Sequence, residues 1–118
     1  MDQVNNSFDV IIIGAGPSGC SCAHQLLDAG KKVLVMDKSK FPRHKPCAGG
    51  ITMKTLRHLP INIDHLVEHT AREMKFSFGG SKEINLSHDN GSCVMVIRDK
   101  FDSYFFEQTI KKGAVFEK

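Results

Sequence analysis

Three glycines near the start of the chain have the spacing of a phosphate-binding turn. Gly14-x-Gly16-x-x-Gly19 follows an apolar, β-branched run and opens a segment with helical periodicity. In such a turn the first glycine permits the tight bend, the second lets the backbone approach a pyrophosphate, and the third lets helix and strand pack closely. The free N–H groups and partial positive charge of the helix N-terminus then face the phosphates. The spacing therefore predicts a dinucleotide site.

Asp37 lies at the position where a dinucleotide site needs an acceptor for the ribose hydroxyls. Asp37 ends the next apolar segment, and the end of a strand can present its carboxylate to ribose hydroxyls. An acid at this place repels a 2′-phosphate, so NADP is disfavoured there. Ala23 lies one helical turn beyond Gly19 and favours close packing of helix on strand. A glycine-rich strand–helix–strand unit that binds nothing is the alternative, and the combined features favour binding over it.

Two further side chains could do chemistry. Cys47 lies in a loop just after Arg43, His44 and Lys45, and these cations should lower the pKa of its thiol and raise the thiolate fraction. Arg98 comes where a strand ends and a helix opens, a place from which a guanidinium can reach a phosphate with several donors. The alternatives are a solvated arginine at position 98 and a buried structural role for Cys47. That structural role is the one expected for the other cysteines, Cys20, Cys22 and Cys93.

The segments that must position these residues alternate between strand and helix patterns. The first part predicts a βαβ start, with a buried parallel strand at residues 8–13, a helix at 17–29 and a second, apolar strand at 31–37. A loop follows over 38–52. Beyond it we expect short helices at 53–59 and 63–70, and an antiparallel group of strands at 74–78, 83–86 and 93–97 with Asn90-Gly91 as the hairpin turn. A helix at 99–112 and a strand from 114 complete an α/β fold, a parallel sheet with an inserted antiparallel segment.

A short histidine motif suggests a metal at first sight. His65-Leu66-Val67-Glu68-His69 matches the H-x-x-E-H pattern of inverted zinc metalloproteases, in which two histidines a helical turn apart bind zinc. No third ligand stands out downstream. We therefore expect an amphipathic surface helix here and predict no metal site.

The composition excludes several classes of protein. The chain has 118 residues, 41% hydrophobic and 25% charged, with 16 basic and 13 acidic residues for a net charge of +3. The longest apolar run, residues 10–13, is far short of the ~20 residues of a membrane helix, and the start of the chain does not resemble a signal peptide. The sequence has no stripe of basic residues interleaved with aromatic residues, so nucleic-acid binding is not indicated. We expect a cytoplasmic location, reduced thiols and one domain at most.

The motifs together resemble a known group of flavoproteins. Residues 9–19, Asp-Val-Ile-Ile-Ile-Gly-Ala-Gly-Pro-Ser-Gly, with Asp37 resemble the FAD-binding start of the superfamily that contains para-hydroxybenzoate hydroxylase. Within it, residues 41–50 resemble the Cys-x-Gly-Gly segment of the geranylgeranyl reductase family. Residues 96–102, followed by a helix and Gly113-Ala114, resemble that family's arginine motif. The resemblance implies a Rossmann-like domain that binds FAD rather than NAD.

The resemblance also implies site residues and an activity. The positions that match the family's FAD site are Gly14, Gly16, Ser18, Gly19, Asp37, Cys47, Ala48, Gly50 and Arg98. Cys47 is the candidate catalytic residue, because a thiol beside the flavin can position an alkene or deliver a proton. Ala48 departs from the glycine of several members. The implied activity is a flavin-dependent reduction of isoprenoid (geranylgeranyl) carbon–carbon double bonds.

The partners and organisation follow from the same resemblance. We expect an isoprenoid or prenyl-lipid substrate, an external electron donor (NADPH or a reduced carrier protein), and peripheral rather than spanning contact with a membrane. Residues 1–52 are expected to form the FAD-binding unit and flavin-facing loop, 53–97 the start of a substrate domain, and 98–118 an incomplete return. The chain is expected to be truncated and inactive alone. Two alternatives stay open: an FAD-dependent monooxygenase or halogenase on this scaffold, and a non-catalytic nucleotide-binding fragment.

Overall fold

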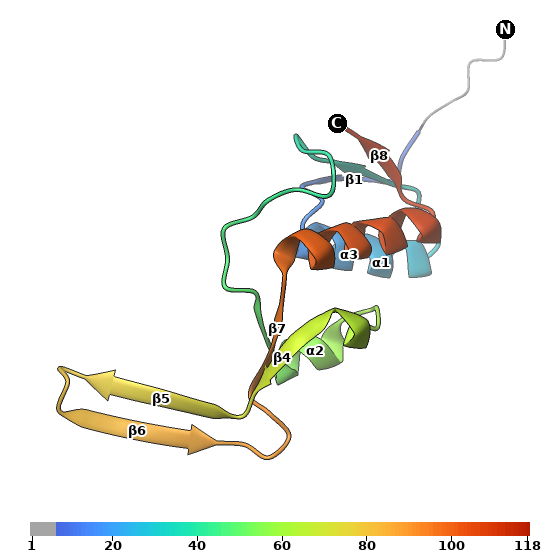
Figure 1. Ribbon diagram of the computed structural model, residues 1–118. Helices are drawn as coiled ribbons and strands as arrows, with labels where there is room; N and C mark the ends of the chain where they lie inside the picture. The colour runs from blue at the N-terminus through green and yellow to red at the C-terminus, as the bar shows by residue number, and fades with distance from the viewer. Residues whose placement is uncertain (1–6) are drawn as a thin grey trace, which may run out of the picture. The chain divides into compact units, whose positions relative to one another are not determined.

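A computed structural model describes residues 7–118 of the chain (Figure 1). It divides the chain into two compact units. Among the described residues, the first unit consists of residues 7–44 and Asp102–Lys118, and the second unit of Lys45–Phe101. The longest helix described, α3 (Arg98–Lys112), begins in the second unit and continues into the first. No helix within residues 7–118 combines the length and apolar character needed to cross a membrane.

The first unit is built on a parallel sheet of three strands. β1 (Val10–Ile13), β2 (Val33–Met36) and β8 (Val115–Glu117) lie in the order β1-β2-β8. Val10 pairs with Val33, and Leu34 pairs with Val115, both in parallel register. The helix α1 (Pro17–Asp28) connects β1 to β2. The expected βαβ start, and the parallel sheet with antiparallel strands inserted in the chain, are therefore confirmed.

The core of the first unit lies on one face of this sheet. Its fully buried members are Ala15, Ala23, Val33, Val35 and Ala114. Leucines of α1 and Phe106 of α3 pack against them, and both helices lie on the same side of the strands in Figure 1. The expectation that the first strand is buried is wrong for the face that points away from this core. Ile11 and Ile13 are 57% and 80% exposed, because both described helices of the unit cover the other face.

The buried face of α1 differs from the expected one at two positions. Cys20, Ala23 and His24 are its buried residues, which follows the i, i+3, i+4 spacing of one helix face. Cys22 falls between these positions and is exposed, so its expected place in the core is wrong. His24 takes a core position instead, with its ring 5.5 Å from that of Phe105. The helix begins with Pro17, whose missing N–H costs no intrahelical bond, and ends before Gly30 at a positive φ.

The second unit contains two antiparallel sheets. β3 (Gly50–Thr52), β7 (Cys93–Val96) and β4 (Val67–Ala71) form one sheet in the order β3-β7-β4. β5 (Glu73–Phe78) and β6 (Lys82–Ser87) form a separate hairpin. The short helix α2 (Met53–His58) follows β3 and is capped by Thr52, whose hydroxyl accepts a hydrogen bond from the Thr55 N–H at 3.2 Å.

Two expectations for the second unit are wrong. Residues 63–70 form no α-helix: a 3-10 turn, Asp64–Leu66, leads into β4. Pairing of β4 with β7, for example Thr70 with Val94, outweighs the weak helix pattern of this β-branched segment. The hairpin turn is made by Gly79 and Gly80, both at positive φ, and not by Asn90-Gly91. The strand after Asn90-Gly91 pairs with β3 and β4 instead of returning along β6.

The histidine motif therefore lies on no α-helix. His65 belongs to the 3-10 turn and His69 to β4, so the two rings do not share one helix face. Among residues 7–118 the side chains include no group of three His, Cys, Asp or Glu placed to hold a metal ion.

The burial of α3 gives a test of the first unit's stability. Phe105 is completely buried, whereas Phe78 in the β5–β6 hairpin is 85% exposed. We expect Phe105→Ala to lower the free energy of unfolding by about 3–5 kcal/mol through lost burial and a cavity. Phe78→Ala, the matched control, should change it by less than about 0.5 kcal/mol. Urea unfolding followed by circular dichroism measures both values, and similar losses for the two variants would contradict the assignment of the core.

Candidate cofactor site

In the glycine turn between β1 and α1, the backbone at Gly19 lies directly against the backbone at Gly14. A Cβ on Gly19 would lie 1.8 Å from the Gly14 carbonyl oxygen, which no side chain could tolerate. Gly14 itself has a φ of +108°, and its N–H donates a hydrogen bond of 2.7 Å to the Met36 carbonyl. A Cβ on Gly16 would meet only the Arg43 guanidinium, at 3.6 Å. Gly14 and Gly19 are therefore required by the fold, whereas Gly16 leaves open space beside the turn.

The first turn of α1 offers unpaired backbone donors to that space. The N–H of Cys20 makes the first intrahelical bond, 2.9 Å to the Gly16 carbonyl, and no side chain caps the helix. The N–H groups of Ser18 and Gly19 come before that bond, where helices leave their donors unsatisfied. Ser18 is exposed. A twelve-residue helix with such an open N-terminus attracts an anion through these donors and its dipole.

Asp37 ties the end of β2 to the same turn. One carboxylate oxygen accepts a hydrogen bond from the Ala15 N–H at 2.8 Å, and the other accepts one from the Ser39 N–H at 2.8 Å. Partial burial raises the pKa of the carboxyl, but these two hydrogen bonds and the positive charges of Arg43 and Lys38 bring it below its usual value of 3.8. The group is therefore ionised at neutral pH. Each oxygen keeps a free lone pair with which it can accept a ribose hydroxyl.

Arg43 is a residue of this site that the sequence reasoning missed. Its expected effect on Cys47 stays a prediction, and the structure places Arg43 in the first unit beside Gly16, where its charge acts on Asp37. Its Nη1 is 2.9 Å from Oδ2 of Asp102, with which it forms an ion pair. A signal was present in the sequence: Asp102 comes three residues before Phe105, a spacing that places both on one helix face, and a buried carboxylate needs a cation.

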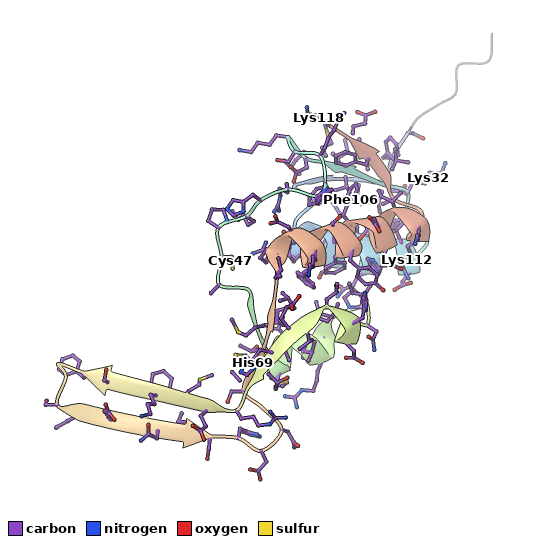
Figure 2. The ribbon with its side chains drawn as sticks, in the orientation of Figure 1. Lys32, Cys47, His69, Phe106, Lys112 and Lys118 are labelled. Atoms are coloured by element: carbon purple, nitrogen blue, oxygen red, sulfur yellow. The ribbon has the colours of Figure 1, made fainter. Side chains whose placement is uncertain are left out.

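The remaining predicted residues lie in the second unit. Cys47, Ala48 and Gly50 are exposed, and Cys47 lies in the extended segment that precedes β3 (Figure 2). Exposure excludes the buried structural role considered for Cys47. Its sulfur accepts a hydrogen bond from the Gly49 N–H at 3.4 Å.

Gly49, rather than Gly50, is the glycine that this segment requires. Its φ is +78°, and a Cβ there would lie 1.9 Å from the Val96 carbonyl oxygen. The Val96 N–H in turn donates to the Gly49 carbonyl at 2.9 Å. The contact places the cysteine segment beside the end of β7, close in sequence to the partly buried Arg98. The second unit thus brings two of the predicted motifs together.

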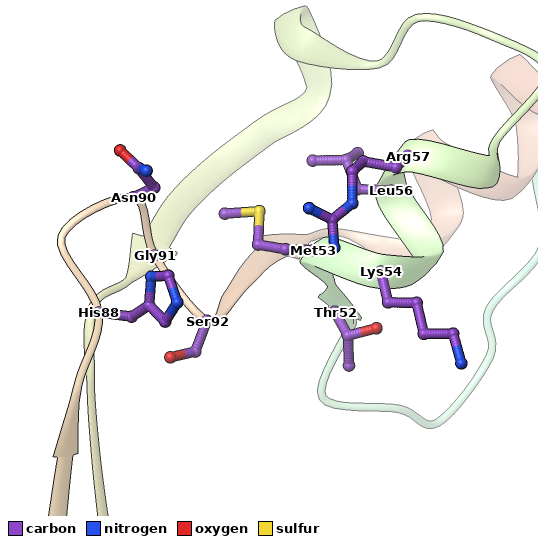
Figure 3. Close-up of a pocket in the computed structure, with 9 residues that line it drawn as sticks. All are labelled: Thr52, Met53, Lys54, Leu56, Arg57, His88, Asn90, Gly91 and Ser92. Atoms are coloured by element: carbon purple, nitrogen blue, oxygen red, sulfur yellow. The ribbon is translucent and has the colours of Figure 1, made fainter.

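A hollow in the second unit lies apart from all the predicted residues. It has a volume of about 440 Å³ and lies between α2 and the turn that precedes β7 (Figure 3). Its lining consists of Thr52, Met53, Lys54, Leu56, Arg57, His88, Asn90, Gly91 and Ser92. No predicted site residue lines it, so the candidate site rests on the geometry of the turns and not on this hollow.

Comparison with known proteins identifies the class of cofactor. A family model described as FAD dependent oxidoreductase matches residues 9–113. Menaquinone reductase of Mycobacterium tuberculosis is 38% identical over 70% of this chain and 21% of its own length. Geranylgeranyl diphosphate reductase of Rhodobacter capsulatus is 30% identical over 91% of this chain and 27% of its own length. The chain thus spans less than a third of the length of these relatives.

Solved structures with the same fold include both reductase-like and halogenating proteins. A geranylgeranyl bacteriochlorophyll reductase-like protein of Thermoplasma acidophilum superposes with a TM-score of 0.82, at 24% identity over 92% of this chain and 29% of that one. The myxobacterial halogenase CndH superposes with a TM-score of 0.75, at 22% identity over 93% of this chain and 28% of its own. At these identities the likeness shows the fold alone.

FAD fits the residues of the first unit. A diphosphate needs backbone donors without a Cβ in the way, and Gly16 with the open first turn of α1 meets that need. A ribose needs an ionised acceptor at the end of the neighbouring strand, and Asp37 is one. The cofactor expected from the sequence is therefore confirmed as FAD by the family. The individual contacts of Gly14, Gly16, Ser18, Gly19, Asp37, Cys47, Ala48, Gly50 and Arg98 stay predictions.

The two non-equivalent glycines of the turn give a direct test. Gly16→Ala should fold with a melting temperature near that of the wild type, because its methyl meets only Arg43 at 3.6 Å. It should nevertheless bind FAD much more weakly, because the methyl occupies the approach of the diphosphate. Gly19→Ala should instead lower the melting temperature strongly. FAD titration by flavin fluorescence and thermal melts separate the two effects, and unchanged FAD affinity in Gly16→Ala would refute the phosphate site.

Asp37 predicts a pH-dependent stability. A carboxyl whose pKa is lowered by folding stabilises the fold above its unfolded value of 3.8, and that contribution is lost as the pH falls through the folded value. Asp37→Asn should therefore be less stable than the wild type at pH 7, and the difference should shrink below pH 3.8. Urea unfolding from pH 7 to pH 2.5 measures it. A constant difference over this range would contradict the assignment.

Proposed function

The chain belongs to the FAD-dependent oxidoreductase family, and from that premise we propose that it is the FAD-binding part of a reductase that saturates isoprenoid carbon–carbon double bonds. The observation that carries the proposal is the relationship to geranylgeranyl diphosphate reductase across 91% of the chain. The segment from Lys45 to Gly50 supports it, because Lys-Pro-Cys-Ala-Gly-Gly resembles the reductases more than the hydroxylases.

Each unit contributes a different part of the proposed chemistry. Bound FAD, once reduced by two electrons from the external donor, would supply a hydride to one carbon of the double bond. In the first unit, the turn and the open end of α1 hold the diphosphate, and Asp37 holds a ribose. In the second unit, the Gly49 N–H orients the Cys47 sulfur, and in its thiol form this side chain would deliver a proton to the other carbon and then regain one from water. Ala48, Gly50 and Arg98 are proposed to contact the cofactor.

The proposed partners follow from the same relationship. The substrate is a prenyl chain, as the name of the Rhodobacter relative indicates for that protein. An external donor, NADPH or a reduced carrier protein, returns electrons to the cofactor. We place the protein in the cytoplasm with peripheral access to a membrane, where a prenyl lipid resides. A quinone is the second candidate substrate, because the Mycobacterium relative is named for menaquinone.

A chimera tests the activity. This chain would replace the matching 27% of the Rhodobacter enzyme, and the chimera would be assayed without oxygen using chemically reduced FAD and geranylgeranyl diphosphate. We expect saturated product, and at least a tenfold lower turnover in Cys47→Ala with FAD content unchanged. Cys22→Ala, also an exposed thiol, is the matched control and should keep full turnover.

Other outcomes of that experiment distinguish the rivals. Product that forms only with oxygen would favour a monooxygenase, and product that needs oxygen and halide would favour a halogenase. A chimera that retains FAD but forms no product under any condition would favour a non-catalytic nucleotide-binding role. Full turnover in Cys47→Ala would refute the role of the thiol but not the reductase.

A further inference from the structure

The first unit holds a buried ion pair that the proposed function leaves without a role. The Asp102 side chain on α3 is completely buried, and the Arg43 side chain is 17% exposed. Burial of two charges carries a large desolvation penalty, which their mutual attraction repays only partly. Apolar side chains would pack here at least as well for stability alone. The pair therefore needs an explanation in terms of what the guanidinium does.

Three contacts fix the guanidinium in one place. Asp102 holds Nη1 at 2.9 Å. The Phe41 ring lies under the guanidinium carbon, with its centroid 5.0 Å away, and that ring stacks on Phe106 of α3 at 4.7 Å between centroids. These contacts all lie within the first unit, so α3 sets the position of Arg43 through a carboxylate and an aromatic stack.

The position so fixed borders the glycine turn. Nη2 of Arg43 lies 3.6 Å from the point where a Cβ of residue 16 would be, and the Arg43 charge also acts on Asp37. A guanidinium has five N–H donors in a planar fork, and the pairing with Asp102 leaves donors on its other edge. That edge and the open N–H groups of the first turn of α1 lie beside the same glycine, so both can donate to one diphosphate.

We infer that Arg43 binds the diphosphate of the cofactor and that Asp102 is a positioning residue that holds Arg43 for this contact. The inference rests on the FAD site of the first unit and not on the identity of the substrate. It also predicts that removing Asp102 changes the affinity for an anion in the direction opposite to the one expected from net charge alone. Removing a carboxylate makes the unit more positive and should strengthen the binding of an anion, whereas loss of a positioning residue should weaken it.

Affinity for FAD and for ADP, which carries the same kind of diphosphate, tests the role of Arg43 in the 118-residue chain. Arg43→Met should weaken both on the order of 10- to 100-fold, the loss of charge-assisted hydrogen bonds. Affinity for adenosine, which has no phosphate, should change less than about twofold. Arg57→Met, which removes an exposed arginine in the second unit, is the matched control and should change none of these affinities.

Asp102→Ala and the double variant test the positioning role. Asp102→Ala should weaken ADP and FAD binding in the wild-type background despite the added positive charge. It should have no further effect on affinity once Arg43 is Met, because a positioning residue acts only through the group it holds. Arg43→Met/Asp102→Leu avoids an uncompensated buried charge. It should keep the melting temperature near the wild type while binding ADP weakly, which a purely structural pair would not do.

The opposing outcomes are distinct. Tighter binding in Asp102→Ala, equal losses for adenosine and ADP, or wild-type ADP affinity in the double variant would each overturn the inference. A wild-type chain that binds neither FAD nor ADP would overturn it together with the cofactor site. An inactive chimera that still shows the expected pattern of affinities would refute the proposed reductase and leave the inference standing.

Discussion

The near contact between Gly14 and Gly19 is the constraint on which the candidate site depends. With no Cβ at residue 19, the start of α1 lies against the end of β1, and the helix axis points its free N–H groups at the turn. The same turn receives the Asp37 carboxylate through the Ala15 N–H. Any side chain at residue 19 would push the helix away from the strand. The donors and the acceptor would then no longer face one cofactor.

A second near contact has the same form in the second unit. Gly49 lies against the Val96 carbonyl as Gly19 lies against that of Gly14, and in each case a Cβ would come within 2 Å of a carbonyl oxygen. In both places a glycine lets a segment of the proposed site lie close to the end of a strand: the open end of α1 in one unit and the Cys47 segment in the other. Gly19 and Gly49 therefore cannot be replaced without moving these segments, whereas Gly16 and Gly50 have room for a methyl group.

Local patterns allowed the first unit to be predicted, and pairing between distant segments decided what was missed. The βαβ start and the glycine turn are encoded within about thirty residues, and the family confirmed FAD. The strand at Val67–Ala71 forms by pairing with β7, which lies far along the chain. The weak helical periodicity of the segment itself therefore led to the wrong prediction of a helix. Cys22 was predicted to be buried, but the buried face of α1 is formed by Cys20, Ala23 and His24. Arg43 was missed because its partner, Asp102, is distant in sequence.

The Arg43–Asp102 pair also explains why α3 is more than a cover for the sheet. Phe105 and Phe106 supply burial, which any apolar helix could do. Asp102, one helical turn earlier, instead pairs with Arg43, whose guanidinium borders the glycine turn. A buried pair of this kind is weak evidence for stability, and it is better understood as a device that selects one arrangement among several. In this unit we propose that the arrangement selected is the one that faces a diphosphate.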